Sequence, residues 1–73
     1  MAVHPNLAAA LAGGPPFKLT TVEVGGAFVA LFLNDVAVFD AEEVDEVLRI
    51  AGPLMSAEAV DHMLEIRPLV ART

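Results

Sequence analysis

The chain has 73 residues, 56% of them hydrophobic, and ten acidic against four basic side chains give a net charge of −6. A single domain of this size buries only about 60% of its unfolded surface. So much apolar side chain in so small a domain favours self-association or a protein partner. The acidic charge disfavours direct nucleic-acid binding, which requires a basic surface.

The chain contains no cysteine, which leaves no disulfide or thiolate chemistry and agrees with a reducing compartment. Its longest apolar run, residues 27–33, is too short to span a bilayer. No Lys or Arg precedes Lys18, and the apolar stretch before it is short and Ala-rich, so the N-terminus is a poor secretory signal. We therefore expect a cytoplasmic protein without membrane contact.

Residues 1–16 predict a helical arm followed by a connector. The Leu- and Ala-rich run at 7–12 is strongly helix-forming. Two glycines and two prolines at 13–16 end the helix and force an extended connection. Leu7 and Leu11 lie one helical turn apart, so they can dock on the rest of the domain or on another subunit.

Residues 17–40 predict a three-stranded antiparallel meander. Gly25-Gly26 and Asn34-Asp35 are two-residue turn signals, because Gly adopts positive φ freely and Asn tolerates it. The β-forming residues around these turns predict strands at 18–24, 27–33 and 36–40.

The two turns set a register that sorts the side chains onto two faces. Val22 is expected opposite Val29, and a bulge, if present, is expected at Thr20 and Thr21. One predicted face carries Val22, Val24, Ala27, Val29, Leu31, Leu33, Val36 and Val38. The other, with all four phenylalanines in the absence of a bulge, carries Phe17, Leu19, Phe28, Ala30, Phe32, Ala37 and Phe39.

Both predicted faces are apolar, so each needs cover. We assign the Phe-rich face to the C-terminal helices because Phe39 leads directly into the first of them, and the reverse assignment stays open. The Val/Leu face is then left for the N-terminal helix and for a second copy, with a dimer as the expected state. The predicted oligomer interface comprises Leu7, Leu11, Val22, Val29, Leu31 and Val38.

The C-terminal part predicts two helices, 41–51 and 57–67. Asp40 is expected to cap the first, with the Glu43 side chain reaching back to it as in a capping box. Pro68 should stop or kink the second. The apolar stripe of the second helix is expected to be Ala59, Val60, Met63, Leu64 and Ile66. The predicted fold class is therefore α+β: a short N-terminal helix, a three-stranded antiparallel β-meander and two α-helices in a single domain over 1–73.

Half of the acidic residues lie within seven positions: Asp40, Glu42, Glu43, Asp45 and Glu46. Acids near a helix N-terminus offset the macrodipole, so one interpretation is a capped and solvated helix. The other is a docking surface for a basic partner, such as a nucleic-acid-binding protein, since charge complementarity steers association.

The other candidate sites have a simpler interpretation. Glu58, His62 and Glu65 share one helical face and form half of a bundle-type metal site, which a symmetric dimer would have to complete. We interpret them as solvated helix surface. His4 has no accompanying nucleophile arrangement, and the paired glycines lack the residues of a phosphate loop. No catalytic residue, metal or cofactor is predicted.

These observations predict a small, acidic, non-enzymatic protein-binding module. We expect an inhibitor or adaptor that docks on a basic surface of a nucleic-acid-handling protein and self-associates. Its profile resembles phage- or mobile-element-encoded antagonists of host defence, which is an analogy by size and charge and not by motif. The alternatives are an assembly subunit or antitoxin-like neutraliser whose apolar sheet face is a permanent interface, and an enzyme or metal protein formed only across a dimer.

Overall fold

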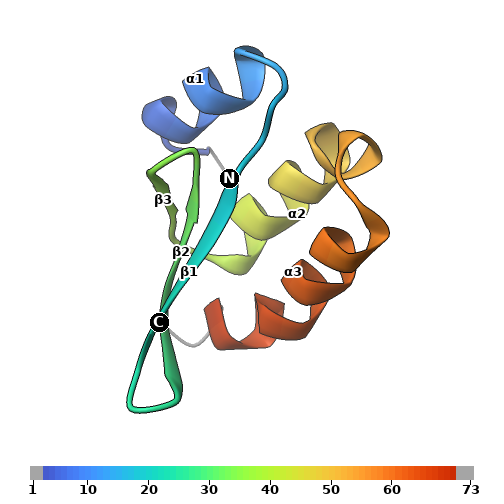
Figure 1. Cartoon of the computed structure of the whole chain (residues 1–73). Helices are drawn as coiled ribbons and strands as arrows, with labels where there is room; N and C mark the ends of the chain where they lie inside the picture. Colours follow the sequence, from blue (N-terminus) through green and yellow to red (C-terminus); the bar gives the residue numbers. More distant parts are fainter. Residues whose placement is uncertain (1–2, 71–73) are drawn as a thin grey trace.

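The computed structural model describes residues 3–70 and confirms the α+β fold. The elements in chain order are α1 (Pro5–Ala12), β1 (Leu19–Val24), β2 (Ala27–Leu33), β3 (Val36–Val38), α2 (Ala41–Ile50), the 3-10 turn η1 (Gly52–Leu54) and α3 (Ala57–Val70). The strands form one antiparallel sheet in the order β1-β2-β3, with the helices gathered to one side of it (Figure 1). Within residues 3–70, every helix falls short of the length and apolar character needed to cross a bilayer.

Both predicted turns form as expected. Gly25 and Gly26 have φ values of 61° and 81°, and Asn34 and Asp35 have 49° and 67°. Positive φ at both central positions is the geometry of the type I′ turn, whose twist matches that of the flanking strands. The Asn34 side chain adds a clamp, because its Oδ1 accepts a hydrogen bond from the Lys18 backbone N–H at 2.7 Å.

The strand register differs from the prediction at one point. Val22 pairs with Ala30 and not with Val29, because β2 carries an extra residue opposite the step from Val22 to Glu23. The bulge therefore lies in β2, and the expected one at positions 20–21 of β1 is absent. A bulge shifts the alternation of the two faces on either side of it.

This shift redistributes the predicted faces. Leu19 pairs with the buried Leu33 and packs against the core, together with Phe17 and Phe28. Val22 moves to the opposite face with Ala30. The expectation that all four phenylalanines share one face is therefore wrong.

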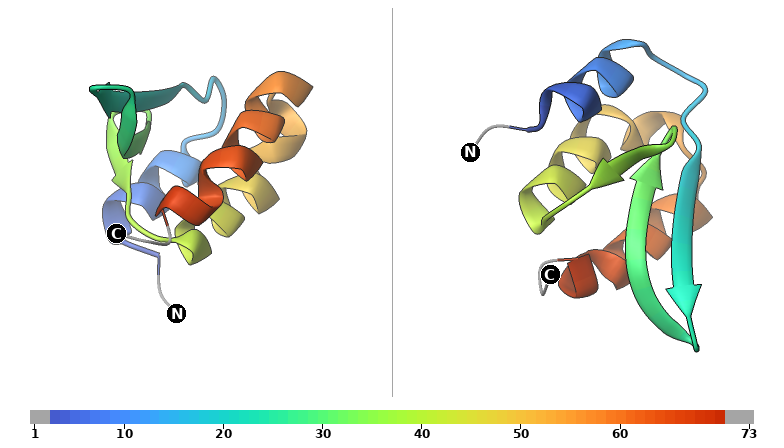
Figure 2. Two further views of the ribbon diagram at one scale, coloured as in Figure 1. Left: turned by 90° about the horizontal axis from the view of Figure 1, so that it is seen from below. Right: turned by 90° about the vertical axis from the view of Figure 1, so that its left-hand side faces the viewer.

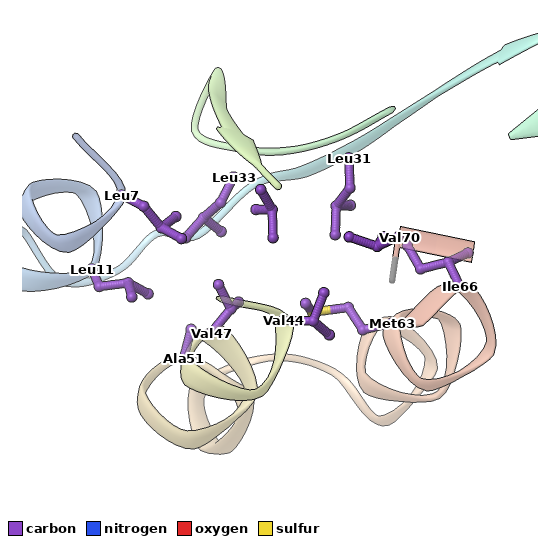
Figure 3. Close-up of a cluster of buried hydrophobic side chains, with 11 residues drawn as sticks. Leu7, Leu11, Leu31, Leu33, Val44, Val47, Ala51, Met63, Ile66 and Val70 are labelled. Carbon is purple, nitrogen blue, oxygen red and sulfur yellow. The ribbon is translucent and has the colours of Figure 1, made fainter. Parts of the chain in front are cut away.

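The core lies between the three helices and the sheet face that carries Leu31, Leu33 and Val38, which is the main part of the predicted Val/Leu face (Figure 3). Its buried residues are Leu7, Leu11, Leu31, Leu33, Val38, Val44, Val47, Ala51, Met63, Ile66 and Val70. The helices thus cover the face opposite to the one we assigned. The reason lies at the end of β3, where Val38 is buried at 5% exposure and Phe39 is 55% exposed, so the chain enters α2 on the side of Val38.

The helices follow the predicted boundaries except at the end of α3. That helix continues through Pro68 to Val70, past the predicted end at residue 67. Val70 is buried at 2% exposure, and we attribute the extra turn to its packing in the core, which offsets the hydrogen bond that proline cannot donate. Leu64, predicted in the apolar stripe, is 52% exposed, and the buried residues of α3 are Met63, Ile66 and Val70.

The sheet narrows to two strands at one end. β3 pairs only with Leu31–Leu33, so β1 and β2 continue alone toward the Gly25-Gly26 turn. We call residues 22–30 the β1–β2 ribbon. Figure 2 shows this ribbon reaching past the helices. Phe28 of the ribbon packs against the core, but Val22, Val24 and Val29 are left exposed.

Candidate functional site

Glu43 is the one charged residue in the described core. Only 1% of it is exposed, although it was predicted to bind a partner. Its Oε2 accepts a hydrogen bond from the His4 backbone N–H at 2.9 Å and lies 2.7 Å from His4 Nδ1. Its Oε1 accepts from the Phe39 backbone N–H at 2.7 Å. We call this arrangement the Glu43 joint, because it holds the chain before α1 to the chain before α2.

The hydrogen bonds of the Glu43 joint determine its charge state. Burial by itself raises the pKa of Glu43, but the bonds from the His4 backbone, the His4 ring and the Phe39 backbone outweigh burial and lower the pKa below its ordinary value. Asp40 caps α2 as predicted, since its Oδ1 accepts from the Glu43 N–H at 2.9 Å. The predicted return bond goes to Phe39, one residue before the cap.

Two other acids of the predicted docking surface are engaged with arginines. Asp45 receives two hydrogen bonds from Arg67, at 2.7 and 2.9 Å, and Glu46 receives one from Arg49 at 2.6 Å. These bonds lower the pKa of both carboxyl groups. With Glu43 buried, the solvent-facing acids of α2 are Glu42, Asp45 and Glu46, and two guanidinium groups offset most of their charge.

The predicted oligomer interface divides into two parts. Four of its residues are at most 5% exposed and belong to the core of a single chain: Leu7, Leu11, Leu31 and Val38. The three helices cover the sheet face that carries Leu31, Leu33 and Val38. Val22 and Val29 remain at the surface on the β1–β2 ribbon.

The ribbon carries a group of exposed apolar side chains. Val22 is 38% exposed, Val24 is 67% exposed and Val29 is 49% exposed. At the root of the ribbon, Val29 and the half-exposed Phe39 border a hollow of about 220 Å³ that also contacts Val70. The ribbon is thus the part of the described chain where apolar side chains meet solvent on a projecting element.

The remaining candidates do not come together as a site. Glu58, His62 and Glu65 are exposed on α3, and no group of three His, Asp or Glu side chains within residues 3–70 is arranged to hold a metal ion. His4 contacts Glu43 through Nδ1, and its ring centroid lies 4.7 Å from that of Phe39.

Sequence reasoning missed the Glu43 joint, which links residues 39 positions apart. One signal was present, because Glu43 precedes Val47 by four residues and so shares its inward side of α2. A carboxyl group at such a position needs buried donors. The sequence pattern does not show that His4 supplies them.

Comparisons with protein-family models, curated proteins and solved structures find no match for this chain.

Proposed function

We propose that the chain is a small, non-enzymatic protein-binding module whose contact surface is the β1–β2 ribbon. The observation that supports this is the exposure of Val22, Val24 and Val29 on an element that projects beyond the helices. Grouped apolar side chains at the surface of a small domain are typical of interaction sites. The other valines and leucines of the sheet lie in the core or pack against it.

The acidic charge has a supporting role in this proposal. A net charge of −6 accelerates encounter with a basic partner, such as a nucleic-acid-handling protein that the module inhibits or recruits. Asp45 and Glu46 already bond arginines of their own chain, so a partner's basic groups must compete for them. We therefore propose that the acidic helix steers the partner and that the ribbon anchors it.

The second candidate is an assembly subunit that binds copies of itself through the same valines. A ribbon that presents β-branched side chains is suited to self-association as well as to a different partner. The two candidates differ in the solution mass of the isolated chain, which stays that of a monomer only if the ribbon is reserved for another protein.

The test measures light scattering on a sizing column over a wide concentration range, then partner capture from lysate. The anchoring variant replaces Val22, Val24 and Val29 with Thr, which keeps the β-branched shape and removes apolar surface. Leu64→Ser, at the similarly exposed Leu64 of α3, is the matched control.

We expect the threonine variant to lose the captured partner, or the dimer, and the Leu64 control to keep it. Changing Glu42, Asp45 and Glu46 to Lys should slow association and alter its salt dependence. Retention of the partner by the folded threonine variant would reject the ribbon as the contact surface.

A further inference from the structure

The outer edge of β1 has the groups needed to receive another strand. In the described chain β1 pairs only with β2. The Lys18 carbonyl accepts from the Asn34 N–H at 2.8 Å, so residue 18 directs its backbone groups toward β2. The period of two then turns the N–H and C=O groups of Leu19, Thr21 and Glu23 away from the sheet. Proline, bulges and charged side chains are the features that usually block pairing at a sheet edge. The β1 strand has no proline and no bulge of its own, and its one charged residue is an acid near its end.

A hollow of about 460 Å³ lies beside the first residue of this edge. Phe17 and Leu19 line one side, and Leu54, Met55 and Ala59 line the other. Its volume is in the range of about 300–1,000 Å³ that is usual for ligand sites. Leu54 is 60% exposed, so the hollow is bordered by apolar surface that the chain itself does not cover.

The chemistry of the hollow selects an apolar occupant. Ser56 contributes the polar side chain of the lining. Its Oγ already accepts a hydrogen bond from the Ala59 N–H at 3.1 Å, as the cap of α3. The other lining side chains are apolar, so a polar guest would lose hydration and find no hydrogen-bonding partner among those side chains. A bulky apolar side chain fits this surface.

The strand added at this edge could come from a second copy of the chain or from a different protein, and the edge and the hollow together distinguish the two. A two-fold pairing of two β1 strands keeps the faces of both copies aligned. Full-length pairing, centred on Thr21, then places Glu23 of the second copy opposite Leu19, where its carboxylate would face the apolar hollow. The register that instead places Leu19 of the second copy opposite Leu19 of the first restricts the pairing to the first half of β1. In these two registers a second copy matches the site poorly, whereas an unrelated extended segment can place any side chain opposite Leu19.

We infer that β1 receives an extended segment of a different protein as a fourth strand, with one bulky apolar side chain of that segment seated in the hollow beside Leu19. This inference rests on the proposed function and specifies its binding mode. Backbone hydrogen bonds to Leu19, Thr21 and Glu23 would supply most of the contact, and the hollow would supply the side-chain preference.

The probe is a displayed library of random ten-residue peptides, selected against the full chain. We expect the selected peptides to share one bulky apolar residue among β-forming neighbours. Ala59→Phe, which fills the hollow, should weaken a selected peptide by about 30-fold, the scale of losing an anchoring side chain. Leu64→Phe, at a similarly helical position away from the hollow, should leave its affinity unchanged.

Methylation of single backbone nitrogens in the selected peptide tests the strand pairing without altering the protein. Binding should be lost at alternate positions only, since successive N–H groups of a strand point to opposite sides. The inference would be overturned if the affinity of the selected peptides is unchanged by Ala59→Phe and does not alternate with the position of the methyl group. A library that yields no binder would overturn it as well.

The proposed function has a separate point of failure. It fails if the threonine variant of Val22, Val24 and Val29 retains its natural partner. Suppose instead that the threonine variant loses the partner while Ala59→Phe and backbone methylation leave binding unchanged. The proposed protein-binding function would then hold, and the strand-addition mode would be wrong.

Discussion

Replacing Glu43 tests whether a buried carboxylate, in addition to the apolar core, holds the N-terminal arm in place. Glu43→Ala leaves the backbone N–H groups of His4 and Phe39 without their acceptor. Each buried donor left unsatisfied costs about 1–3 kcal/mol. The His4 side chain is 55% exposed, so water can reach part of the joint, and we expect a total loss of about 2–4 kcal/mol.

This loss is large for a domain of 73 residues, whose unfolding free energy is expected to be about 4–11 kcal/mol. In a domain of this size each kcal/mol lowers the melting temperature by about 4–8 °C. The assay is urea and thermal unfolding followed by circular dichroism. Glu43→Gln, which keeps the shape and one acceptor oxygen, should lie between the wild type and the alanine variant.

Glu46→Ala is the matched control, because Glu46 lies on the same helix and bonds only a surface arginine among the contacts described. It should change the urea midpoint far less than Glu43→Ala. Equal midpoints for the two variants would refute the reasoning. They would mean that the joint adds nothing to the packing of Leu7 and Leu11.

Three further predictions address other parts of the chain. The pKa of Glu43 is lower in the folded chain than the ordinary carboxyl value of about 4.3, so the ionised carboxylate stabilises the fold fully above that ordinary value. This stabilisation is lost as the pH falls through the lower folded pKa. Urea midpoints should therefore drop on acidification, and less steeply in Glu43→Gln. Asn34→Ala strains a φ of 49° and removes the clamp on Lys18, at a cost of about 1–2 kcal/mol in unfolding free energy, whereas Asn34→Gly should lose only the clamp; equal losses would contradict the strain argument. Met63→Ala should cost about 2–5 kcal/mol and Leu64→Ala within about 0.5 kcal/mol, and the reverse order would mean that α3 presents a different side to the core.

Local signals were enough to predict the elements and their order. The turns at 25–26 and 34–35 follow from residues that tolerate positive φ, and the cap at Asp40 follows from its own side chain. Each of these features depends on residues within four positions of one another. Their identification therefore needs no knowledge of the rest of the chain.

The assignment of the sheet faces failed for a physical reason. In a half-solvated sheet, polar residues mark the outer face, but residues 27–33 are apolar at every position. Nothing in that run marks Val29 as the site of a bulge or distinguishes the side of Leu31 from the side of Phe32. Only the helices, which pack against Leu31 and Val38, determine which face is inside.

The apolar composition of β2 also means that the β1–β2 ribbon lacks a polar outer face. Two strands alone are marginally stable in water and need a third strand or a packed surface. Near Leu31 the ribbon has both, but beyond it β3 and the helices end and Val24 is two-thirds exposed. A partner strand on β1 would supply the missing neighbour and at the same time cover apolar side chains that the domain leaves in solvent. Binding and completion of the sheet would then be one event, which is why the edge of β1, more than the acidic helix, is where we place recognition.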